Sequence, residues 1–377
     1  MSNWPGKYII GLTGNIATGK SVVRRMLEHL GACTIDADAL SHRAIAKGAP
    51  GYRPVLEAFG KFILEAGGEI NRAKLGRIAF NDPEALQQLE SIVHPLVEQA
   101  IDVMVRQADQ YVIVIEAIKL LEGSLAAKCD SIWVVYAMEG LQKARLIQRR
   151  NMSEQEATLR IQSQAPQDVK MAAAKVVIQN TGSFEDTWTQ VVTAWKDIWP
   201  DSDTVPMVVH TAGTGELTIQ RGRPRDSAEI AAFITRLSAR EHPQNSNDIM
   251  AAFGDKAFLL LLDGKTLVGL AGWQVENLVA RTTELYLDPN LAVAPALKTL
   301  VTEVEQSSQD LQCEASLLFL TPELASRESV WKELGYIRRT PQTLGVQAWK
   351  DAAIESQAPN TALFFKQLRQ DRVLRPI

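Results

Sequence analysis

A short glycine-bearing segment near the N-terminus has the residue types and spacing of a loop that binds phosphate groups. Gly14–Ser21 reads GNIATGKS and matches G-x-x-x-x-G-K-[ST] without a mismatch. The glycines let backbone N–H groups point at phosphate oxygens, and the helix that follows adds its positive end. Lys20 is expected to reach the β- and γ-phosphates of ATP, and the Ser21 hydroxyl to coordinate Mg²⁺. The predicted ATP contacts are Gly14, Asn15, Ile16, Ala17, Thr18, Gly19, Lys20, Ser21 and Val22.

Two aspartates follow the second apolar run of the chain. Asp36 and Asp38 flank Ala37 in GACTIDADALSHR. At the carboxyl end of a parallel strand they would face the ligand crevice, beside the phosphate loop. A carboxylate there can bind magnesium or accept the proton of an attacking hydroxyl. Aspartate is also favoured as a helix N-cap, so one of the two can cap the next helix while the other works on substrate.

These residues need a sheet of parallel strands to bring them together. From Lys7 to about Trp199, short apolar runs alternate with amphipathic helical stretches. Runs that are apolar on both faces are typical of buried parallel strands. The alternation therefore predicts a doubly wound α/β domain. The predicted strands are YIIGLTG, ACTIDAD, YVIVIEA, SIWVVYA and AKVVIQN.

The composition is that of a globular protein with more than one domain. The chain has 377 residues, of which 46% are hydrophobic and 22% charged, with a net charge of −4. Nucleic-acid and membrane-surface partners favour a strongly basic face, so neither is expected. Cys33, Cys129 and Cys313 are too far apart for a disulfide framework or a metal cluster, and buried thiols are predicted. Without a signal-peptide pattern or a membrane-spanning run, we expect a cytoplasmic protein.

The residue composition of the chain changes near Pro200. DSDTVPMVVHTAGTGE is polar and contains proline and glycine, as in a linker. The residues after it predict strand, turn and helix, then two or three strands with a tight turn at Asp263-Gly264. We therefore predict a P-loop domain at 1–200, a linker at 201–215 and an α+β domain with an antiparallel sheet at 216–377.

The first domain resembles the dephospho-coenzyme A kinases, the enzymes of the last step of coenzyme A synthesis. GLTGNIATGKS followed by IDAD carries the resemblance, which extends over about residues 7–199. Three later segments are similar to that family's substrate-side helices, its lid, and its closing strand and turn. Matching positions in these segments are Asn71, Arg72, Leu75, Phe80, His94, Pro95, Gln142, Arg145, Arg149, Gln164, Asn180 and Gly182.

The resemblance implies that Asp38 is the general base, which takes the proton of the ribose 3′-hydroxyl of dephospho-coenzyme A as that oxygen attacks the γ-phosphate. Asp36 would orient the site or help Ser21 to hold magnesium. With Asp38 and Lys20, the lid residues Arg145 and Arg149 complete the predicted catalytic group, because cations stabilise the charge that develops on the γ-phosphate.

Several of these assignments have a structural alternative. Arg145 and Arg149 lie one helical turn apart, which is equally typical of a solvated helix face. His94-Pro95 is equally typical of a helix boundary, because the residue before proline is pushed out of helical geometry. The predicted substrate contacts are Asp36, Asp38, Arg72, Leu75, His94 and Glu116.

The sequence departs from the family pattern at two places. Asn15 and Ala17 stand where the family usually has glycine, so some backbone freedom is lost. The third strand usually ends in D-x-P-L-L, whereas this chain has IEAIKLL, in which Glu116 keeps the carboxylate on a longer stem and the proline is missing. We expect these departures to affect the substrate pocket and not nucleotide binding.

The second domain resembles GNAT-type N-acetyltransferases in the order of its predicted elements. VWKELGYIRR is similar to that family's late helix and the turn after it. The glycine-rich turn with which that family binds pyrophosphate is absent, since the corresponding stretch reads LDPNLAVAPALKTLVTEVEQ. A degenerate domain that serves packing, dimerisation or regulation is therefore expected, with Trp273, Trp331 and Trp349 in its core.

The predicted fold class is α/β, a P-loop kinase with a parallel sheet and helical lid, followed by an α+β GNAT-like domain. The predicted function is ATP- and Mg²⁺-dependent phosphorylation of dephospho-coenzyme A. The alternatives are another small-molecule P-loop kinase of the nucleoside monophosphate type, a nucleotide-binding regulatory module without turnover, and an acetyltransferase in the second half. A homo-oligomer would form through the second domain.

Overall fold

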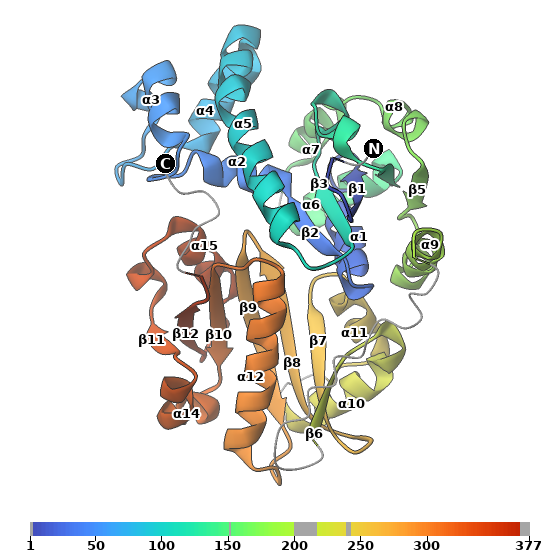
Figure 1. Cartoon of the computed structure of the whole chain (residues 1–377), viewed down its shortest axis with the longest axis vertical. Coiled ribbons are helices and arrows are strands. Elements are labelled where there is room, and N and C mark those ends of the chain that lie inside the picture. The colour runs from blue at the N-terminus through green and yellow to red at the C-terminus, as the bar shows by residue number, and fades with distance from the viewer. Residues whose placement is uncertain (1–2, 151, 200–216, 239–242, 370–377) are drawn as a thin grey trace.

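The five apolar runs of the first half form one parallel sheet with strand order β2-β3-β1-β4-β5 (Figure 1). Each β1 pairing is parallel, with Leu12 beside Glu116 of β3 and beside Trp133 of β4. The predicted α/β architecture is therefore confirmed. The strands are β1 (Tyr8–Thr13), β2 (Cys33–Asp36), β3 (Val112–Glu116), β4 (Ser131–Tyr136) and β5 (Val176–Gln179).

Helices cover both faces of this sheet, as the two-sided apolar strands require. Ile9 points into a core shared with the helices at residues 37–107, whereas Ile10 points into a core shared with the first and last helices of this half. The helices are α1 (Lys20–His29), α2 (Ala37–Ala44), α3 (Tyr52–Phe59), α4 (Arg72–Asn81), α5 (Pro83–Gln107), α6 (Glu139–Arg150), α7 (Glu154–Gln162), α8 (Gln167–Ala172) and α9 (Phe184–Lys196).

The helix boundary considered at His94-Pro95 is wrong. α5 runs from Pro83 to Gln107 with Pro95 inside it. Asp82 caps its start by accepting hydrogen bonds from the N–H groups of Glu84 and Ala85. Packing of the apolar face of α5 into the core outweighs the local cost of the proline.

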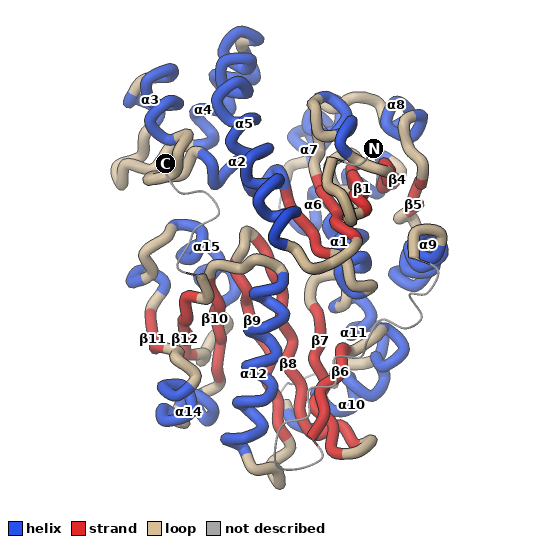
Figure 2. The backbone as a smooth tube through the Cα atoms, in the orientation of Figure 1, coloured by secondary structure: helices blue, strands red, loops and turns tan. Residues whose placement is uncertain are grey.

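The second half forms a seven-stranded sheet with order β11-β12-β10-β9-β8-β7-β6. Its paired neighbours are antiparallel except β9 and β10, which are parallel. This confirms the predicted α+β architecture, with helices on both faces (Figure 2). The strands are β6 (Leu217–Arg221), β7 (Ala257–Asp263), β8 (Thr266–Glu276), β9 (Val279–Leu287), β10 (Ala315–Leu320), β11 (Ile337–Arg339) and β12 (Ala362–Gln367). The helices are α10 (Ser227–Leu237), α11 (Ser246–Ala252), α12 (Val293–Asp310), α13 (Pro322–Ala325), α14 (Glu328–Glu333) and α15 (Gln347–Ser356).

The computed structural model describes residues 3–150, 152–199, 217–238 and 243–369. The predicted linker at 201–215 lies outside these residues, so the domain boundaries stay a prediction. The predicted turn at Asp263-Gly264 is shifted by one residue, because Asp263 pairs with Thr266 and Gly264 and Lys265 form the loop. None of the helices in the described residues combines the length and apolar character needed to cross a bilayer.

Candidate active site

The phosphate-binding loop connects β1 to α1, the context that the motif requires. Gly14 and Gly19 have φ of 153° and 95°. A Cβ on Gly14 would lie 2.4 Å from the Val135 carbonyl oxygen, and one on Gly19 would lie 2.0 Å from Asn180 Nδ2. Both glycines are therefore needed for space, and Gly19 also for its left-handed backbone.

The two departures in the loop are accommodated differently. Ala17 adopts φ of 58°, so it keeps the left-handed backbone of a glycine at a cost of roughly 1–2 kcal/mol. Asn15 is buried, and its Nδ2 donates to the Ala165 carbonyl at 2.9 Å. The expected loss of backbone freedom thus affects Ala17, whereas Asn15 adds a hydrogen bond.

Charged and polar groups hold the loop from the side of β5 and α6. Arg145 donates from Nη1 to the Ala17 and Thr18 carbonyls, each at 3.1 Å, and from Nη2 to the Asn180 carbonyl at 3.0 Å. Asn180 Nδ2 donates to the Thr18 carbonyl at 2.8 Å. The structure therefore brings Arg145 against the loop, as expected of a lid cation.

Lys20 and Gln164 also contact the loop. Lys20 Nζ donates to the Gly14 carbonyl at 3.0 Å and to the Asn15 carbonyl at 3.3 Å. Gln164 Oε1 accepts the N–H of Ile16 at 2.7 Å. In this arrangement the Ile16 N–H and the Lys20 ammonium donate to oxygens of the protein. Both are donors of the kind that bind phosphate oxygens in such loops.

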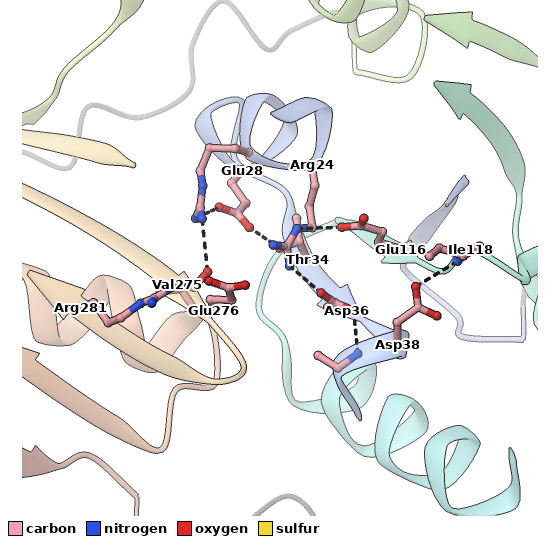
Figure 3. A network of polar contacts seen from close by, with 12 residues as sticks. Arg24, Glu28, Thr34, Asp36, Asp38, Glu116, Ile118, Val275, Glu276 and Arg281 are labelled. Carbon is pink, nitrogen blue, oxygen red and sulfur yellow. Dashed lines mark hydrogen bonds and ion pairs between the residues drawn. The ribbon is translucent and has the colours of Figure 1, made fainter. Parts of the chain in front are cut away.

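Asp36 ends β2 and caps α2. Its Oδ1 accepts the N–H of Ala39 at 2.8 Å, and its Oδ2 lies 3.8 Å from Arg24 Nη1. Arg24 Nε also lies 3.0 Å from Glu116 Oε2, at the end of β3 (Figure 3). Burial raises the pKa of Glu116, and the Arg24 guanidinium opposes that rise. Of the two aspartates, Asp36 is therefore the one with the structural role.

Asp38 lies in the first turn of α2 and lines a cavity of about 400 Å³. Its Oδ2 accepts the N–H of Ile118 at 3.1 Å. Burial and the neighbouring Asp36 raise the pKa of Asp38, whereas the Ile118 N–H and the charges of Lys20 and Lys170 lower it. The carboxylate thus faces a space large enough for part of a small-molecule substrate.

The remaining predicted substrate contacts divide between two cavities. His94 is exposed and lines the cavity of Asp38, together with Ser41 and Glu90. Arg72 is exposed at the start of α4 and lines a different cavity, next to the second half of the chain. Leu75 is 2% exposed and packs in the core. These roles stay predictions.

For three further predicted residues the structure gives only a location. Ser21 is exposed in the first turn of α1, and Val22 follows it with its side chain half-buried. Arg149 lies in α6, and its side chain is outside the described residues.

Lys170 on α8 is a candidate site residue that the sequence analysis did not identify. It is 4% exposed, and its Nζ donates to the Ile118 carbonyl at 2.8 Å. The N–H of the same Ile118 donates to Asp38, so the ammonium and the carboxylate flank one residue. Burial and the charge of Lys20 lower the pKa of Lys170. A single lysine on a polar helix gave no sequence signal, because nothing local distinguishes it from a solvated lysine.

The residues present fit a magnesium ion that is held mainly by substrate phosphates. Among the residues described, no three His, Cys, Asp or Glu side chains are grouped to hold a metal. Ser21 offers an exposed hydroxyl at the start of α1, whereas the oxygens of Asp36 already face Ala39 and Arg24. Mg²⁺ in nucleotide sites commonly has few protein ligands, so Ser21 suffices as a direct one.

The fold and this site define a P-loop kinase, with a phosphate loop, a basic lid residue and a carboxylate beside a cavity. A family profile described as Dephospho-CoA kinase matches residues 8–186. The dephospho-CoA kinase of Geobacter metallireducens is 43% identical over 192 residues, which cover 50% of this chain and 96% of that protein. That of Bacillus anthracis is 40% identical over 189 residues, covering 48% and 93%. The chain belongs to the dephospho-CoA kinase family.

Solved structures that are similar to part of this chain include a kinase and an acetyltransferase. The dephospho-CoA kinase from Campylobacter jejuni is 26% identical, covers 51% of this chain and 97% of its own, and has a TM-score of 0.38. A GNAT-family acetyltransferase from Staphylococcus aureus is 13% identical, with coverage of 41% and 99% and a TM-score of 0.34. The family match concerns the first half alone.

The expectation for the tryptophans is confirmed, since Trp273, Trp331 and Trp349 are buried in the cores of the second half. All three cysteines are free thiols, of which Cys33 and Cys313 are buried as expected and Cys129 is half-buried. Burial raises the pKa of Cys33 and of Cys129 to about 12, so neither is a reactive thiolate.

Proposed function

We propose that the first half of this chain transfers the γ-phosphoryl group of ATP to the ribose 3′-hydroxyl of dephospho-coenzyme A, giving coenzyme A and ADP. The observation that carries this proposal is the position of Asp38, which lines a substrate-sized cavity and lies close enough to Lys20 of the phosphate loop for that charge to lower its pKa. Membership of the family supports the choice of acceptor.

In the proposed reaction the acceptor oxygen forms a bond to the γ-phosphorus as the bond to the bridging oxygen of ADP breaks. Asp38 takes the proton of the hydroxyl. Only its ionised form can do so, and its raised pKa moves the loss of this form to a higher pH than for an ordinary aspartate. The Ile118 N–H keeps the acceptor face of the carboxylate oriented.

Cations supply most of the remaining stabilisation. Lys20 and Arg145 lie against the phosphate loop, and Lys170 lies across Ile118 from Asp38. We propose that Lys170 contacts the transferring phosphoryl group from the side of α8, because its ammonium is preorganised in a largely desolvated position. Mg²⁺, bound through Ser21 and the phosphates, would neutralise charge on the triphosphate.

The test is ADP release from the purified full chain with ATP, Mg²⁺ and dephospho-coenzyme A, with the product identified by mass and by the position of its new phosphate. Nucleosides and nucleoside monophosphates at equal concentration are the alternative acceptors. Preferred turnover of one of these would assign the chain to another small-molecule kinase. ATP binding without turnover of any acceptor would favour a regulatory nucleotide-binding protein.

Two broader assignments belong to the same proposal. We place the reaction in the cytoplasm, where free thiols such as Cys33, Cys129 and Cys313 stay reduced. Association of two copies through the second half stays a prediction, for which sedimentation of the full chain is the measurement.

A further inference from the structure

The turn between β8 and β9 has a sequence that its backbone does not favour. Glu276 pairs with Val279, so Asn277 and Leu278 form a two-residue hairpin loop. Their φ angles are 52° and 60°. Such turns favour Asn-Gly, because both central residues need positive φ. Leucine at the second position is strained, and strain of this kind persists only where surrounding contacts compensate for it.

The compensating contact of Leu278 is with the first half of the chain. Its side chain packs against the core cluster formed by β1–β3 and the helices at residues 37–107. It lines a narrow cavity together with Leu40 of α2, Met104 of α5 and Leu311. An apolar residue at the end of a hairpin of the second half therefore reaches the hydrophobic core of the kinase half.

Backbone carbonyls of the same hairpin bind two arginines of the kinase half. Arg25 Nη2 donates to the Val275 carbonyl at 3.2 Å, and Arg43 Nη1 donates to the Asn277 carbonyl at 2.6 Å. Arg43 also forms an ion pair with Glu314, whose side chain is 1% exposed. The N–H of Glu314 in turn donates to the Leu278 carbonyl at 2.8 Å. Val275–Leu278, the hairpin tip, is thus joined to both α1 and α2. Figure 3 shows Val275 and Glu276 of the tip beside α1.

The hairpin tip rests on a stiff base. Arg281 of β9 is 2% exposed and forms an ion pair with Glu276. Its Nη1 also donates to Glu355 of α15 at 2.7 Å and to Ser356 at 3.2 Å. A buried guanidinium bonded on both sides limits movement of the hairpin relative to its own domain.

The two helices that the hairpin tip contacts both carry groups of the kinase site. α1 begins at Lys20, and its Arg24 binds Glu116 and Asp36. α2 begins after Asp36 and carries Asp38 in its first turn and Arg43 in its last. The N-terminal end of α2 is therefore held from within the kinase half, and the C-terminal end through Arg43 by the second half.

The two helices differ in how much they depend on the hairpin tip. α1 has additional contacts with the second half, because His29 Nε2 lies 3.3 Å from the Phe253 carbonyl and Arg221 Nη1 donates to the Glu28 carbonyl at 3.3 Å. α2 is joined to the second half through Arg43 and Leu278. Disturbance of the hairpin tip should therefore reach Asp38 more than the phosphate loop.

From these contacts we infer that the hairpin tip of the second half is a positioning element of the kinase, which fixes α2 so that Asp38 faces the acceptor cavity. Leu278 and Arg43 are its positioning residues. The inference rests on the proposed function, since it assigns Asp38 to the acceptor. The family profile ends at residue 186, so this support comes from a part of the chain that the profile does not cover.

The test compares two neighbouring substitutions in the full chain. L278N removes the apolar contact but keeps a residue that tolerates positive φ. We expect kcat/KM for dephospho-coenzyme A to fall roughly tenfold to a hundredfold, since small misplacement of a reacting group has effects of this size. KM for ATP should change less than about twofold, because α1 keeps its other anchors. N277G is the matched control: it keeps the Asn277 carbonyl and suits the turn, so its kinetics should equal those of wild type.

A second variant, R43Q/E314Q, tests the polar contact without leaving a buried charge unpaired. We again expect a lower kcat/KM for dephospho-coenzyme A and an unchanged KM for ATP. Its control is R236Q, which removes an ion pair between Arg236 and Asp288 within the second half. Thermal unfolding and ATP titration of every variant identify any that do not fold; a folded L278N decides the outcome if R43Q/E314Q does not fold.

The two proposals fail in different ways. If wild type does not phosphorylate dephospho-coenzyme A, the proposed function is wrong. If wild type is active and folded L278N has wild-type kinetics for both substrates, the hairpin tip does not position Asp38. Equal losses for ATP and for the acceptor would also overturn the inference, because a general structural defect predicts no split.

Discussion

The two sheets differ in which residues lie together at the ends of their strands. In the first half, β1, β2 and β3 run in parallel, so their carboxyl ends bring Lys20, Asp36 and Glu116 to one edge. In the second half most neighbouring strands are antiparallel, and their ends alternate between opposite edges. Parallel strands gather functional groups from distant parts of the chain, whereas antiparallel strands of this sheet separate them.

Charged groups with little exposure show a related contrast. In the kinase half, the half-buried Asp38 lines a cavity, and the buried Lys170 binds Ile118, whose N–H donates to Asp38. In the second half, the buried Arg281 and Glu314 form ion pairs with Glu276 and Arg43. Asp38 thus borders a cavity, whereas Arg281 and Glu314 join elements of the protein to one another, as the buried Arg24 and Glu116 do within the kinase half.

The largest effect should come from D38N. Removal of a general base lowers kcat by roughly 10²–10⁴-fold, while ATP affinity should be kept. In wild type, kcat should fall as pH drops through the raised pKa of Asp38, and D38N should lack this fall. D168N, on the exposed start of α8, is the control for loss of a carboxylate. Normal turnover by D38N in the ADP-release assay would remove the main contrast between the two halves.

A smaller loss is expected for K170M, which keeps the length of the side chain without its charge. Loss of one preorganised donor costs roughly a hundredfold in kcat. Because the charge of Lys170 lowers the pKa of Asp38, the acid limb of the pH profile should also move to higher pH. Thr13 Oγ1 still donates to the Ile118 carbonyl at 3.1 Å, so no acceptor is orphaned. K175M, at an exposed lysine, should leave both rate and pH profile unchanged.

Two glycines with positive φ sharpen the comparison further. In G19A the new Cβ meets Asn180 at 2.0 Å, and KM for ATP should rise roughly tenfold, which is about 1.4 kcal/mol. Gly264 has φ of 59° and no atom within 4 Å of an added Cβ. G264A should therefore lower the free energy of unfolding by about 1–2 kcal/mol, which is the cost of a left-handed backbone for alanine, and should leave the kinetics unchanged. Kinetic assays and denaturant unfolding of both variants separate the two effects.

The smallest expected effect is a null result with acetyl-CoA. The turn from β9 to α12 contains Pro289 and no glycine, and Ala292 caps α12 without a side-chain hydrogen bond. We expect no saturable heat when acetyl-CoA is titrated into D38N already saturated with dephospho-coenzyme A. Titration of dephospho-coenzyme A into D38N without added ligand should give a signal. Binding of about one acetyl-CoA molecule per chain at a second site would contradict the prediction that the second half is a degenerate domain.

Much of the fold was predictable because its signals are local. The five apolar runs of the first half are all strands, since two-sided hydrophobic segments have few alternatives to a buried parallel sheet. The helix boundary at Pro95 was wrong because burial of α5 outweighs a local preference. In the second half the turn at Asn277-Leu278 was missed, because leucine in a left-handed turn contradicts the pattern that identifies hairpins.

The candidate site was predictable to the extent that its residues lie in contiguous motifs. The phosphate loop and the aspartate pair could be recognised from the residues, whereas Arg145 was assigned through the family resemblance. Lys170 could not, because its contact with Ile118 joins α8 to the end of β3 across the fold. Only the tertiary structure shows that Asp36 caps α2 and that Asp38 lines the cavity, because an aspartate at either position could take either role.

By itself, the sequence determined that a loop with the glycine spacing of a phosphate-binding loop stands between a strand and a helix, because that pattern is local. It also determined the alternation of elements that makes the first sheet parallel. The tertiary structure decided which side chains meet across the sheet edge and how the hairpin tip reaches α1 and α2. Those contacts depend on packing between segments distant in sequence, for which no local preference exists.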